Sequence, residues 1–93
     1  MTYFAVEYLS RADADVAAIR PEHRAYLATL KDSGSLKASG PYVGTDRDRA
    51  LLIFEAADQA ALIALLDADP MSVNNIIETR TVTEWNPVIR VFE

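Results

Sequence analysis

The sequence contains no cysteine and only one histidine, His23, among its 93 residues. Without cysteine the chain has no disulfide, no zinc–thiolate site and no thiol nucleophile. A single histidine with scattered carboxylates is poor support for a metal site. The sequence also lacks the glycine-rich pattern of nucleotide-binding folds and the G-x-S-x-G turn of serine hydrolases. We therefore expect a protein that uses neither a metal nor a cofactor.

Long hydrophobic runs and positive charge are also scarce. The longest purely apolar run, residues 60–66, is far shorter than the roughly 20 residues that cross a bilayer. The first residues lack the basic start and apolar core of a signal peptide, so we expect a cytoplasmic protein. With 9 Lys and Arg against 14 Asp and Glu, the net charge is -5. This acidity argues against nucleic acid or an anionic membrane as a partner.

The hydrophobic residues, 51% of the chain, are enough for one core, so we expect residues 1–93 to form a single domain. Patterning predicts strands at 3–9, 36–39, 50–55 and 76–85, with a further extended segment at 88–92. It predicts one helix starting at Pro21, because proline suits the first helical position and breaks an interior one. A second helix follows the cap Asp58. The order βαββαβ plus a C-terminal edge segment predicts an α+β, ferredoxin-like split βαβ fold.

Both faces of the predicted sheet need cover. Leu51 to Phe54 form a continuous apolar run, and apolar residues in the first strand point both ways. The two helices cover one face, and no third helix is available for the other. A second copy of the same sheet would cover it, so we expect a two-fold homodimer with sheets packed face to face.

His23 shares a predicted helix stripe with Tyr26, Leu27 and Leu30, and this stripe should face the interior. Imidazole is the side chain that titrates near neutral pH, so an inward position suggests acid/base chemistry. Taken alone, the position is explained at least as well by a histidine that is simply packed in the core.

Asp69 follows Leu66 by three residues and Leu62 by seven, which would continue the buried stripe of the second helix. Asp69-Pro70 is an equally good cap and first-turn pair for a new short helix. We expect the two helices to run parallel, which puts His23 and Asp69 at opposite ends of the sheet. They then meet only if residues 13–19 lengthen the first helix or if the helices cross steeply.

Short motifs follow one another along most of the chain. They are Arg20-Pro21-Glu22-His23, Leu27 and Leu30, Gly34-Ser35-Leu36, Ser39-Gly40-Pro41 and Asp67-Ala68-Asp69-Pro70. In this order they resemble the YCII-related (YciI-like) family. The resemblance implies a dimeric α+β barrel whose active site contains the histidine and aspartate that correspond to His23 and Asp69. It also implies proton-transfer chemistry, such as halide elimination from a hydroxylated ring or lactone isomerisation.

We interpret the chain as a small cofactor-independent enzyme that transfers protons on a small, cyclic or aromatic oxygenated metabolite. His23 would be the acid or base and Asp69 the carboxylate that orients it. Arg20 would attract an anionic substrate, although an exposed arginine is more often a solvated charge. Gly40-Pro41 would let a ligand approach the backbone, although a glycine before proline at a strand end is more often just a turn. The further predicted substrate contacts are Ser39, Gly40 and Pro41. The alternatives are a noncatalytic domain that binds a metabolite in the same pocket, and a purely structural dimer module with His23 packed.

Overall fold

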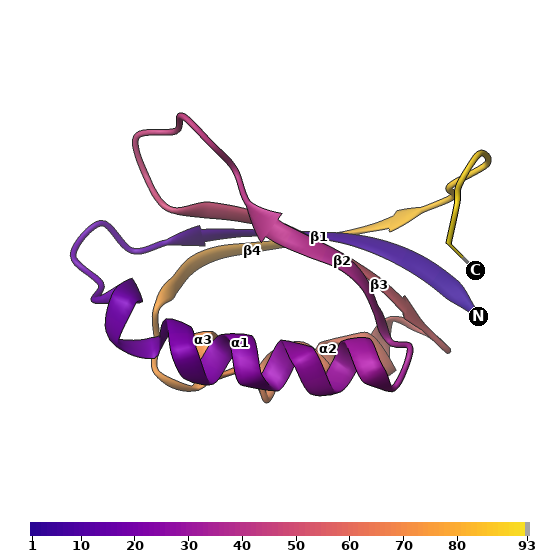
Figure 1. The fold of residues 1–93 in the computed structure, drawn as a ribbon, viewed down its shortest axis with the longest axis horizontal. Helices are drawn as coiled ribbons and strands as arrows, with labels where there is room; N and C mark the ends of the chain where they lie inside the picture. The colour runs from indigo at the N-terminus through magenta and orange to yellow at the C-terminus, as the bar shows by residue number, and fades with distance from the viewer. Residues whose placement is uncertain (93) are drawn as a thin grey trace.

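The structure, a computed structural model, describes residues 1–92 as two layers (Figure 1). One layer is an antiparallel sheet in the order β2-β3-β1-β4, and the other holds the helices, which all cover the same face. The elements in chain order are β1 (Thr2–Ser10), α1 (Val16–Asp32), β2 (Leu36–Pro41), β3 (Arg49–Ala56), α2 (Gln59–Asp67), α3 (Pro70–Val73) and β4 (Ile77–Trp85). This is the predicted ferredoxin-like split βαβ fold.

The two longer helices run antiparallel, so the parallel arrangement expected from the sequence is wrong. β1 and β3 pair antiparallel, with Phe4 opposite Phe54, and each helix returns the chain along the strand before it. Because the strands point in opposite directions, α1 begins at the end of the sheet where α2 ends (Figure 1). At this end α1 packs against α3. The topology therefore places the start of α1 near residues that follow α2.

α1 starts at Val16, so Pro21 lies inside the helix and not at its first position as predicted. Asp15 caps the helix by accepting a hydrogen bond from the backbone N–H of Ala18 at 3.2 Å. A proline at position 21 cannot donate to the carbonyl of Ala17. Both Ala17 and Pro21 are exposed, so that carbonyl can bind water and the helix continues through the proline.

The other local predictions are close to the structure. Asp58 caps α2 by accepting from the backbone N–H of Ala61 at 2.8 Å. The first three strands extend slightly beyond their predicted bounds, and β4 begins one residue later than predicted. Residues 88–92, which we expected to be extended at the sheet edge, form a bent segment instead. This segment returns to β1, where the ring centroids of Phe92 and Tyr3 lie 5.5 Å apart.

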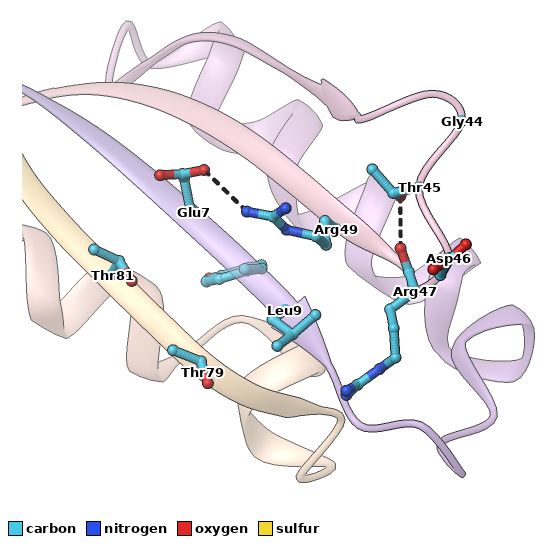
Figure 2. A pocket seen from close by; sticks show the side chains of 10 residues that line it. Glu7, Leu9, Gly44, Thr45, Asp46, Arg47, Arg49, Thr79 and Thr81 are labelled. Atoms are coloured by element: carbon cyan, nitrogen blue, oxygen red, sulfur yellow. Dashed lines mark hydrogen bonds and ion pairs between the residues drawn. The ribbon is translucent and has the colours of Figure 1, made fainter.

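The core lies between the sheet and the helices. Its buried residues are Phe4, Val6, Tyr8, Leu27, Leu30, Leu36, Leu52, Phe54, Ala56, Leu62 and Leu66. No helix within residues 1–92 is both long enough and apolar enough to cross a membrane. Strand alternation turns a second set of side chains, among them Leu51 and Trp85, to the outer face of the sheet, which the helices leave uncovered (Figure 1). At one end of this outer face Glu7 pairs with Arg49 at 3.6 Å (Figure 2).

Pro21→Ala is expected to raise the free energy of unfolding by about 2 kcal/mol. An interior proline is about 3 kcal/mol less favourable than alanine in a helix, and the added freedom of the unfolded chain returns up to about 1 kcal/mol of that gain. Urea denaturation followed by circular dichroism measures the change. Glu22→Ala, at the next exposed position, is the control and should stay within about 0.5 kcal/mol. A Pro21→Ala variant no more stable than the parent contradicts this account.

Candidate functional site

A pocket of about 460 Å³ lies between α1 and the sheet, at the end where α1 begins. Ligand pockets in proteins measure roughly 300 to 1,000 Å³, so this one is large enough for a ring-sized molecule. Its apolar wall includes Val16, Leu27, Leu52, Met71 and Ile77. Its charged and polar lining includes Arg20, His23, Arg24, Ser39 and Asp48. Side chains from all four strands, α1 and α3 meet here, so the pocket exists only in the folded chain.

The residues predicted to contact the substrate all line this pocket. Arg20 comes from α1, and Ser39, Gly40 and Pro41 come from the exposed edge strand β2. Arg20 lies 3.8 Å from Asp48, with both side chains well exposed. A Cβ added at Gly40 would meet nothing within 4 Å, so packing does not require glycine at this point. Because Gly40 has no side chain, a ligand can approach the backbone at this part of the pocket wall.

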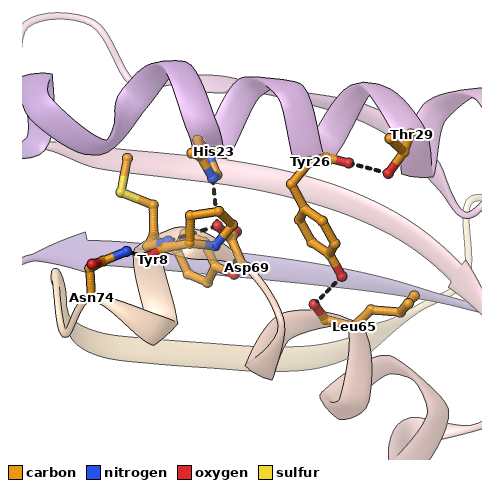
Figure 3. Close-up of polar contacts among 9 residues, drawn as sticks. Tyr8, His23, Tyr26, Thr29, Leu65, Asp69 and Asn74 are labelled. Atoms are coloured by element: carbon orange, nitrogen blue, oxygen red, sulfur yellow. Dashed lines mark hydrogen bonds and ion pairs between the residues drawn. The ribbon is translucent and has the colours of Figure 1, made fainter.

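His23 and Asp69 are in direct contact (Figure 3). The Nδ1 atom of His23 lies 2.8 Å from Oδ1 of Asp69. The side chain of His23 is 13% exposed and that of Asp69 is 1% exposed. His23 lines the pocket. Asp69 is buried behind the imidazole and does not line the pocket itself. The antiparallel course of the helices brings the two residues to the same end of the sheet, and α1 also begins earlier than Pro21, at Val16.

Asp69 also caps α3. Its Oδ1 accepts the backbone N–H of Met71 at 2.9 Å, and its own backbone is extended. α2 has already ended at Asp67 with Ala68 as its C-cap, so Asp69 does not continue the stripe of α2. The alternative interpretation, in which Asp69-Pro70 begins a new short helix, is confirmed, and the same carboxylate also contacts His23. A carboxylate has enough lone pairs to accept several donors at once.

Tyr8 belongs to the same cluster as His23 and Asp69, although no sequence motif predicted it as a site residue. Its hydroxyl donates to Oδ2 of Asp69 at 3.2 Å, and its side chain also lines the pocket. Burial raises the pKa of Tyr8 well above its ordinary value, and the nearby charge of Asp69 raises it further. Tyr8 therefore stays protonated and remains a donor. The available signal was its inward position beside Phe4 and Val6, because a buried tyrosine hydroxyl needs a partner.

Tyr26 ties α1 to α2 one turn beyond His23 (Figure 3). Its hydroxyl donates to the backbone carbonyl of Leu65 at 2.7 Å. Burial raises the pKa of Tyr26, with a further contribution from the charge of Asp69. This hydrogen bond fixes the position of α1, which carries His23, relative to α2, which precedes Asp69.

The contact with Asp69 determines which nitrogen of His23 carries a hydrogen. A carboxylate only accepts hydrogen bonds, so Nδ1 must be protonated. In the neutral ring this leaves Nε2 with a lone pair, as an acceptor or base. Within residues 1–92 no group of three or more His, Asp or Glu side chains is arranged to hold a metal ion.

A comparison with family models matches residues 1–86 to the YCII-related domain. The chain belongs to the YCII-related domain family. This confirms the resemblance seen in the motifs around His23 and Asp69. No curated protein matches the chain by sequence.

Several solved structures share the fold of this YCII-related chain. One is the 5-chloro-2-hydroxyhydroquinone dehydrochlorinase TftG from Burkholderia phenoliruptrix AC1100, in complex with 2,5-dihydroxybenzoquinone. It is 22% identical, with a TM-score of 0.80 over 90% of this chain and 93% of that one. Another is a dimeric ferredoxin-like protein of unknown function from Jannaschia sp. CCS1, which is 17% identical, with a TM-score of 0.54 over 92% and 99% of the two chains. At these identities the likeness shows the fold.

Asp69→Ala is expected to lower the free energy of unfolding by about 3 to 5 kcal/mol, because it removes the acceptor of two buried donors and of the partly buried His23, and it removes the cap of α3. Chemical denaturation measures the loss. The matched control is Asp67→Ala, which removes an exposed carboxylate that pairs with Arg80 at 2.9 Å and should cost at most about 1 kcal/mol. Equal losses in the two variants would contradict the central position of Asp69.

Proposed function

We propose that the protein is an enzyme that transfers protons by general acid/base catalysis with His23, without a cofactor. The observation that carries this proposal is the imidazole in the wall of a ligand-sized pocket, held at Nδ1 by a buried carboxylate 2.8 Å away. Only Nε2 remains for a ligand. A histidine held in this way can remove and return a proton near neutral pH.

In the proposed reaction, Nε2 of His23 takes a proton from the substrate and the ring becomes an imidazolium. Asp69 stabilises that charge and keeps the ring from rotating, while Tyr8 and the backbone of Met71 hold Asp69. In an elimination, the electrons of the broken bond expel the leaving group. In an isomerisation, the imidazolium returns the proton at another atom.

The proposed substrate is a small, cyclic or aromatic oxygenated metabolite. The size of the pocket and its apolar wall suit a single ring. The ring would contact β2 at Ser39, Gly40 and Pro41. There the pocket is lined by backbone atoms and by the hydroxyl of Ser39. The likeness to a structure of a dehydrochlorinase bound to a dihydroxybenzoquinone supports this substrate class and an elimination as the first reaction to test.

His23→Ala is expected to lower turnover by about 10² to 10⁴, the usual contribution of a positioned acid or base. We would assay 5-chloro-2-hydroxyhydroquinone by chloride release, and a panel of hydroxylated rings and lactones by deuterium incorporation from solvent. Glu22→Ala, next to His23 on the exposed side of α1, is the control and should retain full activity. Turnover that survives His23→Ala removes His23 from the mechanism. Specific binding without turnover would favour the noncatalytic alternative.

We also propose that the outer face of the sheet is the interface of a two-fold homodimer. This face carries Leu51 and Ile53 in the central strand β3, and Trp85 at the end of β4 is 41% exposed. The segment after β4 adds exposed apolar side chains at Val88 and Ile89. Ile53 is already buried in the single chain and Leu51 is half-buried, so the apolar surface left in water is mainly that of Trp85, Val88 and Ile89. Exposed apolar side chains grouped in this way are typical of an interaction surface, and a second copy supplies the same surface in return.

Leu51→Lys is expected to convert the dimer to a monomer, because it would bury a charge at the centre of the proposed interface. Sedimentation velocity over a concentration series measures the change. Ala64→Lys, which adds the same charge on the exposed side of α2, should leave the dimer intact. A monomeric parent protein, or a Leu51→Lys variant that stays dimeric, would contradict the proposed interface.

A further inference from the structure

The pocket beside His23 has a charge opposite to that of the whole chain. The protein carries a net charge of -5, yet the charged residues that line this pocket are Arg20, Arg24, Arg49 and a single acid, Asp48. A cleft with an excess of one charge raises the local concentration of oppositely charged ligands. Among the lining residues the excess is positive, and the carboxylate of Asp69 lies behind His23, where it contacts Nδ1.

The three arginines are not equally available. Arg49 is already occupied, because its guanidinium lies 3.6 Å from Glu7 and over the ring of Tyr42 at 5.4 Å, near the outer face of the sheet (Figure 2). Arg20 has only the long, exposed contact with Asp48 at 3.8 Å, which is a weak interaction in water. Arg24 has no hydrogen-bond or ion-pair partner in the described part of the chain, residues 1–92. Arg20 and Arg24 can therefore still bind an anion.

The spacing of these two arginines also points to a ligand. Arg20 and Arg24 are four residues apart on α1, so they lie on one face of the helix, and His23 shares that face. Like charges at this spacing destabilise a helix by about 0.2 to 0.5 kcal/mol. An anion placed between the two guanidinium groups would offset this repulsion and would lie next to the imidazole.

We propose that the substrate is an organic acid with one anionic group, a carboxylate in the simplest case, held between Arg20 and Arg24. Guanidinium groups bind carboxylates through paired hydrogen bonds. The ring-sized body of the acid would lie against the apolar wall formed by Leu27, Leu52 and Met71. The inference rests on the proposed function only in calling the ligand a substrate, since the binding can be measured by itself.

Benzoate and its neutral isostere benzamide are suitable probes, and His23 is a built-in reporter. The chain has one histidine, so the imidazole C–H signals in a proton–carbon NMR spectrum belong to His23 without further assignment. Titration of each probe against these signals gives a dissociation constant for the pocket. We expect benzoate to bind about tenfold more tightly than benzamide, and this preference to shrink as the salt concentration rises.

Variants of α1 test the role of each arginine. Arg20→Gln and Arg24→Gln should each weaken benzoate binding about five- to tenfold and leave benzamide unchanged. Arg24→Lys should restore part of the loss, because it keeps the charge and loses the paired geometry. Lys31→Gln is the matched control: it removes one positive charge from the exposed, far end of the same helix, and both probes should bind as in the parent.

Three results would overturn the inference. They are equal affinity for benzoate and benzamide, failure of both probes to move the His23 signals, and a loss in Lys31→Gln as large as that in Arg24→Gln. These results are separate from the test of catalysis. A chain that selects benzoate through its arginines but turns nothing over contradicts the enzyme proposal and not this one. His23-dependent turnover with equal probe affinities does the reverse.

Discussion

A carboxylate buried inside a protein is stable only where hydrogen-bond donors replace the water it has lost, and Asp69 is buried to 1% exposure. Its donors are Tyr8 from β1, His23 from α1 and the backbone of Met71 in α3. Tyr8 and His23 precede Asp69 by 61 and 46 residues, so the carboxylate links the sheet and α1 to the start of α3. The same contacts that satisfy Asp69 determine the orientation of the imidazole.

This arrangement gives the site its chemical asymmetry. Asp69 occupies Nδ1 of His23 on the protein side, and Nε2 is left for the pocket. Tyr8 stays protonated because burial and the charge of Asp69 both oppose its ionisation. The tautomer and the orientation of His23, the proposed catalytic residue, therefore follow from hydrogen bonds already present in the fold.

The charge of the pocket lining differs in sign from the net charge of the whole chain. The chain as a whole is acidic, which suits solubility, while Arg20 and Arg24 give the mouth of one pocket the opposite sign. Acidic residues far from the pocket repel anions weakly and over a short range in salt, and within the pocket Asp48 is the one acidic lining residue. Net charge thus argues against nucleic acid as a partner but does not describe the charge of this pocket.

Much of the fold could be predicted from local signals in the sequence. Asp58 marked the start of α2, and alternating and continuous apolar runs marked the strands. The predicted start of α1 was wrong because an interior proline was assumed to break the helix. At this exposed position water can bind the carbonyl of Ala17 that lacks its helical donor, so the helix continues through Pro21. The prediction of helix direction failed because it did not follow from the strand pairing, which requires α1 and α2 to be antiparallel.

The sequence alone determined the residue types of the site and their order, because the motifs that contain His23 and Asp69 are local and their family is recognisable. It did not determine that the two side chains touch, nor that Tyr8 joins them. Those contacts depend on β1 and α1 bringing residues that are 61 and 46 positions away along the chain to the same place as Asp69. Only the packed tertiary structure decides such distances, since sequence spacing within one helix or strand carries no information about the next.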